Sequence, residues 1–166
     1  IENITADNAR LVSNLHANLG GLYRINGHPD LAREHMEKSI SLLDQFNLLH
    51  INDSIPQIAN YAMFLTEQQE PERGISELQK LSGIIKEYHS DHCLDYAKVQ
   101  ETLGTIYLMT ANLPQAKTHF KRAFKIYEKI WADEPEMIEA KYQEIQELYP
   151  QIGFCIGKNL SGLLTK

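Results

Sequence analysis

Three residues within five positions carry side chains that commonly bind metal ions: His89, His92 and Cys93. Imidazole nitrogens and thiolates are the usual ligands of zinc, and a structural zinc site takes four of them. No second Cys/His pair stands at a zinc spacing, and the other cysteine, Cys155, lies far along the chain. We therefore interpret the cluster as a loop between helical units and expect no metal. A metal-binding or enzymatic role for His89–Cys93 stays open as an alternative.

Other residues capable of acid–base chemistry stand apart from one another in the sequence. His16 has apolar neighbours and is expected to be an interior histidine, whereas His28 and His35 are expected on the surface or in packing contacts. The chain has no glycine-rich phosphate loop, no nucleophile elbow and no HExxH motif. We therefore expect no cofactor and a protein that is not an enzyme.

Composition narrows the classes of partner. The 166 residues are 43% hydrophobic, and 16 Lys and Arg face 22 Asp and Glu, which gives a formal net charge of −6. An acidic balance argues against direct nucleic-acid binding, which needs a basic surface. No apolar run approaches the ~20 residues that cross a bilayer, so no membrane contact is expected. Two cysteines and no signal-peptide pattern favour a cytoplasmic location, and Ile1 in place of Met suggests a piece of a longer protein.

The chain repeats itself with a period of 42 residues. Small residues recur at two positions of the period, twelve residues apart: Gly20, Ala62 and Gly104 at the first, and Ala32, Gly74 and Ala116 at the second. Short side chains at these places allow two helices to approach closely. The repeat therefore predicts three similar units, each with a close contact between two helices.

Each unit is expected to be a helix, a short turn and a second helix. Apolar residues follow helical spacing, as in the stripes Leu15, Leu19, Leu22, Tyr23 and Val99, Leu103, Ile106, Tyr107. Pro29, Pro71 and Pro114 each mark the start of a second helix. We predict helices near 6–26, 29–47, 54–68, 71–89, 93–110, 114–132 and 135–149.

A fourth unit begins but is incomplete. Gln146 occupies the slot of Gly20 and Gly104, and a long polar side chain there suits a helix without a close partner. We predict a repeat domain over residues 1–150, with repeats at about 13–54, 55–96 and 97–138 and a capping helix at 135–149. Residues 151–166 are expected to form a C-terminal tail that either caps the array or continues it.

These residues resemble the tetratricopeptide repeat, in which a small residue is followed by an aromatic three positions later. The segment Leu103-Gly104-Thr105-Ile106-Tyr107, followed by Ala116, Phe120 and Ala123, matches the pattern closely. The long period makes the repeats similar to those of kinesin light chains and their bacterial relatives. The resemblance implies an all-α fold, a right-handed superhelical array of antiparallel helix pairs with a concave face lined by the first helix of each pair.

Counting from the small residues places one set of side chains on that concave face. These are Asn14, Asn18 and Arg24 in the first copy, Asn60 and Met63 in the second, and Lys98, Glu101 and Thr105 in the third. Asn18 and Asn60 hold the same slot, and an amide can both donate to and accept from a peptide backbone. Asparagines there resemble backbone-reading residues of light-chain-like repeats; solvated polar residues are the alternative interpretation.

The sequence is compatible with four hypotheses for function. The first is a non-catalytic module that binds a protein or extended peptide in its groove, as part of a larger regulatory or sensor protein. The second is the signalling-peptide sensor domain of a bacterial regulator. The third is the metal or enzymatic role of His89–Cys93, and the fourth is a structural array that drives oligomerisation. The oligomeric state and the identity of the partner stay open.

Overall fold

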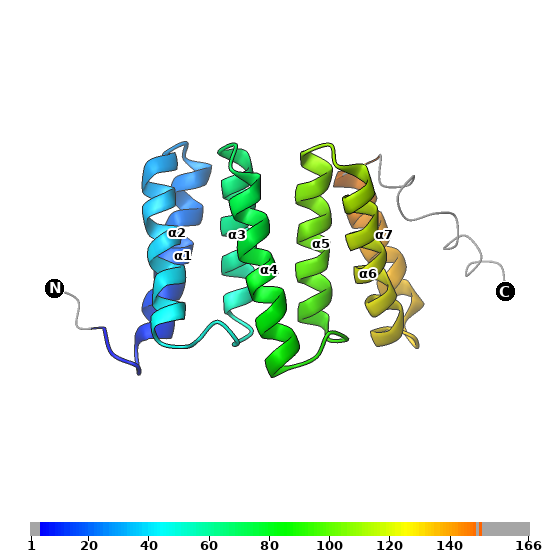
Figure 1. Cartoon of the computed structure of the whole chain (residues 1–166), viewed down its shortest axis with the longest axis horizontal. Coiled ribbons are helices and arrows are strands. Elements are labelled where there is room, and N and C mark those ends of the chain that lie inside the picture. The colour runs from blue at the N-terminus through cyan, green and yellow to red at the C-terminus, as the bar shows by residue number, and fades with distance from the viewer. Residues whose placement is uncertain (1–3, 149, 151–166) are drawn as a thin grey trace. The chain divides into compact units, whose positions relative to one another are not determined.

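The computed structural model describes residues 4–148 and residue 150, and this part of the chain contains seven α-helices and no strand (Figure 1). The helices are α1 (Ala9–Ile25), α2 (Pro29–Gln45), α3 (Ser54–Glu67), α4 (Pro71–Tyr88), α5 (Leu94–Met109), α6 (Leu113–Ile130) and α7 (Pro135–Leu148). Helices α1–α4 form one compact unit, and helices α5–α7 form a second that begins after residue 88. The predicted all-α class and all seven helices are confirmed, with ends within three residues of those expected.

The turn inside each helix pair repeats as closely as the helices do. Gly27, Gln69 and Ala111 stand 42 residues apart, and each adopts the left-handed conformation, with φ of 75°, 64° and 59°. In each turn the next backbone N–H donates to a carbonyl five residues back, as from His28 to Tyr23 at 2.9 Å. This pattern closes a helix and reverses the chain. Glycine adopts the left-handed conformation without strain, so Gly27 suits its turn. Gln69 and Ala111 adopt the same conformation at some cost, which the packing of the surrounding helices must offset.

The small residues sit where two helices nearly touch. A Cβ atom added to Gly20 would lie 2.6 Å from Met36 Cγ and 3.2 Å from the Ala32 carbonyl oxygen. One added to Gly104 would lie 2.9 Å from the Phe120 ring. The predicted contact between Gly20 and Ala32 is thus present, and these glycines set the spacing of α1 from α2 and of α5 from α6.

Each unit has its own apolar core. In residues 1–88, Ala32 and Met36 of α2 pack against Tyr61, Phe64 and Leu65 of α3, with Tyr23 and Ile40 at the edge. In the second unit, Phe124 meets Tyr127 and Tyr142 edge to face, at ring-centroid distances of 5.8 and 6.1 Å. Residues of both cores come from more than one helix, so the helices of a unit stabilise one another rather than folding singly.

One apolar stripe is not buried. In α5 the residues Val99, Leu103 and Ile106 are buried, as the helical spacing suggests. Their counterparts in α1, Leu15, Leu19 and Leu22, are exposed. The spacing shows which face of a helix is apolar, but burial also requires a neighbouring element on that face, and α1 has its neighbours α2 and α3 on other sides.

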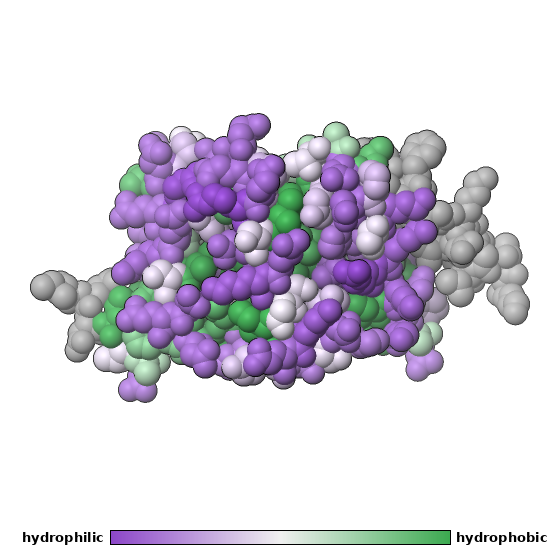
Figure 2. All heavy atoms as spheres, viewed as in Figure 1, coloured by the Kyte–Doolittle hydropathy of each residue, from purple (hydrophilic) through white to green (hydrophobic). Residues whose placement is uncertain are grey.

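None of the helices described is long and apolar enough to cross a membrane. In the view of Figure 2, hydrophilic side chains cover most of the surface and hydrophobic ones show mainly between them. The expected tail at 151–166 lies outside the described residues, and the predicted repeat boundaries stay a prediction.

Candidate functional site

Three of the predicted groove residues line one depression in the first unit. It has a volume of about 380 Å³ and lies between α1 and α3. Its lining residues are Asn14, Ala17 and Asn18 from α1, Asp53 at the N-cap of α3, and Pro56, Gln57 and Asn60 from α3. The 42-residue period thus brings Asn18 and Asn60, which hold the same slot of two copies, to one site.

The floor of this depression, formed by Asn14 and Gln57, is connected to the core by a chain of hydrogen bonds. The Gln57 Oε1 atom accepts from the hydroxyls of the buried Ser13, at 2.8 Å, and Ser39. The Gln57 amide then donates to Asn14 Oδ1 at 2.5 Å. Buried polar groups paired in this way rigidify their surroundings. The side chain of Asn14 is therefore held in place rather than free to follow a ligand.

Asp53 provides the negative charge of the site. Its carboxylate accepts from Arg10 Nε at 2.7 Å and from Asn14 Nδ2 at 3.4 Å. These two hydrogen bonds, that of Arg10 first, lower the pKa of Asp53 below its ordinary value. The carboxylate therefore stays ionised at neutral pH and keeps Arg10 and Asn14 oriented around the depression.

The rim of the depression, formed by Asn18 and Asn60, differs from the floor in its exposure and its hydrogen bonding. Asn18 and Asn60 are exposed, and neither side chain makes a hydrogen bond to another described residue. Each amide offers two donors and an acceptor with two lone pairs. The site therefore combines a preorganised polar floor with two adaptable amides, an arrangement suited to pairing with the N–H and C=O groups of an extended peptide.

The other two predicted residues of the first unit do not line the depression. Arg24 forms a two-pronged ion pair with Glu67, in which Arg24 Nε donates to Glu67 Oε2 at 2.8 Å. Met63 is half-buried on α3. Arg24 is thus engaged within the protein, and its guanidinium joins α1 to the end of α3.

The three predicted residues of the second unit lie on α5. Lys98 is exposed, and Thr105 is half-buried. Glu101 accepts from the Tyr127 hydroxyl at 2.6 Å and from Lys141 Nζ at 3.2 Å, which joins α5 to α6 and α7. Burial, and then the Glu101 charge, raise the pKa of Tyr127 well above its ordinary value. The carboxylate of Glu101 therefore already has partners inside the second unit.

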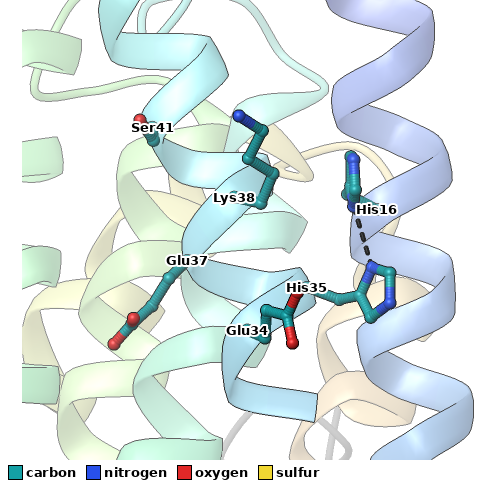
Figure 3. Close-up of a pocket in the computed structure, with 6 residues that line it drawn as sticks. All are labelled: His16, Glu34, His35, Glu37, Lys38 and Ser41. Carbon is teal, nitrogen blue, oxygen red and sulfur yellow. Dashed lines mark hydrogen bonds between the residues drawn. The ribbon is translucent and has the colours of Figure 1, made fainter. Parts of the chain in front are cut away.

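Two histidine contacts that were not predicted from the sequence repeat at twice the period. His16 Nδ1 lies 2.8 Å from His35 Nδ1 (Figure 3). Tyr23 stacks on His35, with ring centroids 5.3 Å apart. In the second unit, 84 residues later, His119 Nδ1 lies 2.9 Å from Gln100 Oε1. Tyr107 stacks on His119, again at 5.3 Å. The spacing of 84 residues between the paired histidines and tyrosines was the available signal.

These repeated contacts identify His35 and His119 as residues that join two helices of a pair. Figure 3 shows His16 and His35 pointing toward each other from α1 and α2, beside a polar depression of about 540 Å³. In the second unit Gln100 stands at the position of His16, and it still contacts the histidine of the following helix, His119. The pair therefore acts through hydrogen bonding and stacking, for which metal binding is not required.

The stability of the second unit is expected to fall as pH falls through about 6.5, the ordinary histidine pKa, because His119 resists protonation when folded. Burial, and then the nearby Arg122 charge, lower the pKa of His119. Below pH 6.5 the unfolded chain therefore binds more protons than the folded one, so lowering the pH favours unfolding until the folded pKa is passed. Urea denaturation at several pH values checks this. In the variant His119→Gln the free energy of unfolding should depend less steeply on pH below about 6.5. Equal pH dependence in the variant and the wild type would contradict the role given to His119.

The His89–Cys93 segment forms the turn before α5. Cys93 is the N-cap of α5: its Sγ accepts from the Tyr96 N–H at 3.4 Å and donates to the Ser90 carbonyl at 3.1 Å. His92 Nδ1 lies 2.5 Å from Asp91 Oδ1. Among the residues described, no group of three or more His, Cys, Asp and Glu side chains is placed to hold a metal ion. The thiol has a structural use in starting a helix.

Comparison with known proteins agrees with this architecture. The tetratricopeptide repeat family matches residues 54–129, which run from α3 to α6. The crystal structure of BtubC (BKLC) from P. vanneervenii is similar with a TM-score of 0.71 and 18% sequence identity. The similarity covers 92% of this chain and 60% of that one, so the chain spans well under the full length of its structural relative. No curated protein matches the sequence. Residues 54–129 therefore match the tetratricopeptide repeat family, and the similar crystal structure supports the same all-α repeat fold.

Proposed function

We propose that the chain is a non-catalytic module that binds a protein partner through an extended peptide segment. Tetratricopeptide repeats generally mediate protein–protein interaction, and the chain carries that family's signature. The observation that carries the finer proposal is the pair Asn18 and Asn60, exposed and without hydrogen-bond partners among the described residues, on the rim of one depression. A solvated pair on two unrelated faces would offer no such shared site.

The chemistry of the depression favours the peptide backbone over a particular side chain. Its polar groups are mostly neutral amides, and its one carboxylate, Asp53, is already bound to Arg10. Neutral amides recognise the N–H and C=O groups that every peptide presents, whatever its sequence. Specificity among peptides would then come from side chains further along the ligand. The host of this module, in our proposal, is a larger regulatory or sensor protein.

Replacing both rim amides is expected to weaken peptide binding about 10- to 100-fold. Each amide lost removes one or two hydrogen bonds, worth about 0.5–1.5 kcal/mol apiece, and every 1.4 kcal/mol is tenfold in affinity. The measurement selects peptides from a random library on the wild-type chain. It then compares their affinities for wild type and Asn18→Ala/Asn60→Ala by calorimetry.

Gln79→Ala provides the matched control. Gln79 is an exposed amide on α4 of the same unit and is not among the residues that line the depression. Its replacement should leave peptide affinity unchanged. Peptides that bind the double variant as tightly as wild type would refute the proposed site, and a library that yields no binder would refute peptide binding itself.

A further inference from the structure

Helix α6 carries a row of exposed lysines that the proposed function does not use. They follow one another every fourth residue and form what we call the α6 strip: Lys117, Lys121, Lys125 and Lys129. Residues at this spacing lie on the same side of a helix, each about one turn from the next. The other side of α6, which includes Phe120, Phe124 and Tyr127, is buried in the second unit. The strip is therefore the outward face of a helix whose inward face is already packed.

The strip concentrates positive charge on an acidic chain. The chain as a whole has a formal net charge of −6. The 18 residues of α6 nevertheless include the four strip lysines and Arg122, against a single acidic residue, Glu128. The positive face of α6 is thus a local feature that the overall composition does not explain.

The strip has no partner of opposite charge inside the described part of the protein. None of its four ammonium groups forms an ion pair or a hydrogen bond with another described residue, whereas Lys141 of α7 is bound to Glu101 and Glu144. Residues 151–166 contain no Asp or Glu, so that segment supplies no side-chain carboxylate for the strip. The negative charge that would complement the strip has to come from another molecule.

The arrangement of the strip weakens the helix that carries it. Like charges four residues apart on a helix repel and destabilise it, by about as much as opposite charges at that spacing stabilise it. The strip contains three such pairs in succession, from Lys117 to Lys129. An anionic partner would remove this repulsion when it binds, so the same charges that disfavour the free helix favour the complex.

The spacing of the lysines matches an extended peptide with alternating acidic residues. Neighbouring lysines of the strip are separated by about 6 Å along the helix axis, at about 1.5 Å per residue. In an extended peptide, side chains two residues apart lie on the same face and are separated by about 6.6 Å. Seven residues with a carboxylate at every second position therefore present four carboxylates to four lysines. We propose that the α6 strip docks an acidic, extended segment of a partner protein.

Nucleic acid and membrane surfaces match the strip less well. Single-stranded nucleic acid binds where aromatic side chains stack on its bases, but Phe120, Phe124 and Tyr127 of α6 are buried. The net charge of −6 also repels a phosphate backbone. A helix that binds a membrane surface inserts its apolar face, and the apolar face of α6 is packed within the unit.

Docking at the α6 strip goes beyond the proposed peptide binding and does not depend on it. The depression with Asn18 and Asn60 lies between α1 and α3 of the first unit and shares no residue with the strip. Asn18→Ala/Asn60→Ala should therefore bind an acidic peptide as the wild type does. Failure of one site leaves the other untouched.

Fluorescence anisotropy of a labelled Glu-Ser-Glu-Ser-Glu-Ser-Glu peptide measures the docking directly. Lys121→Glu/Lys125→Glu should raise the dissociation constant about 10-fold or more, because two exposed ion pairs are replaced by repulsion. Raising NaCl from about 0.05 M to about 0.5 M should weaken wild-type binding to a similar extent, since exposed charges are screened. A peptide with Gln in place of Glu should not bind measurably.

Thermal denaturation of the same variant provides a second readout. Lys121→Glu/Lys125→Glu turns the repulsive pairs with Lys117 and Lys129 into attractive ones, so the variant should melt a few degrees above the wild type. A folded, more stable variant that binds less peptide has lost a docking surface and not its structure. A variant less stable than the wild type would contradict the repulsion within the strip and overturn the proposal.

Lys38→Glu/Lys80→Glu is the matched control, because it changes the net charge equally at two exposed lysines of the first unit. This variant should bind the acidic peptide like the wild type. An equal loss in the control would show attraction by overall charge alone and would overturn the proposal, as would a wild-type chain that does not bind the peptide. Tighter binding of an oligothymidylate or of phosphatidylserine vesicles than of the peptide would also overturn it and assign the strip to nucleic acid or membrane.

Discussion

Gly74→Ala is expected to lower the free energy of unfolding by about 1–3 kcal/mol, although alanine is the better helix former. A Cβ atom at this position would lie 2.6 Å from the backbone oxygen of Ala62 and 3.2 Å from its carbonyl carbon. These are backbone atoms of α3, so relief requires α3 and α4 to move apart. Urea denaturation monitored by circular dichroism measures the loss.

Gly83→Ala on the same helix is the control for the intrinsic preference. A Cβ atom there has no neighbour within 4 Å, so the substitution should stabilise the protein by about 0.5–1 kcal/mol. The two alanines should therefore shift stability in opposite directions. If both stabilise the chain, the close approach of α3 to α4 at Gly74 is not a constraint, and the structural role of the small residues is wrong.

Gln57→Ala is expected to have the largest effect, a loss of about 3–5 kcal/mol. The substitution leaves a cavity in the core, which costs about 2 kcal/mol or more for a side chain of this size. It also removes the acceptor shared by the fully buried hydroxyls of Ser13 and Ser39, which keep only each other and the Ser39 carbonyl as partners, and it removes the donor to Asn14. Each hydrogen bond lost costs about 0.5–1.5 kcal/mol. Thermal and urea denaturation of the variant measure the sum.

A triple variant separates the polar part of this effect from the cavity. In Ser13→Ala/Ser39→Ala/Gln57→Leu, every buried member of the network is apolar and the volume of Gln57 is largely retained. Removing both partners of a buried hydrogen bond is far less costly than removing one. The triple variant should therefore be more stable than Gln57→Ala, and a triple variant that is no more stable would show that the hydrogen bonds contribute little.

The sequence predicted the helices and the close contacts well because both depend on local pattern. Proline at a helix start and small residues at a fixed period specify where helices begin and where they touch, and neither requires knowledge of distant neighbours. The turns were only partly predictable. Gly27 indicates a left-handed turn. Gln69 and Ala111 adopt the same conformation although their residue types disfavour it, so the sequence did not indicate it at these two positions.

The site was predicted at its rim and missed at its floor. Asn18 and Asn60 share a slot of the period, so their meeting at one depression follows from the repeat. The floor depends on Ser13, Ser39 and Gln57, which come from three helices and follow no shared pattern in the copies. The exposed leucines of α1 were not foreseen either, because an apolar stripe does not say whether another helix covers it.

The most direct test of the account combines a change in the chain with a change in the peptide. In a library-selected peptide, one backbone N–H at a time is removed by replacing an amide bond with an ester. The affinity of each ester peptide is then measured for the wild-type chain and for Asn60→Ala. If Asn60 hydrogen-bonds to the peptide backbone, one ester substitution and Asn60→Ala should together weaken binding by less than the sum of their separate effects. The difference in binding free energy should be about 0.5–1.5 kcal/mol. Additive losses at every position of the peptide would contradict backbone recognition by the rim amides.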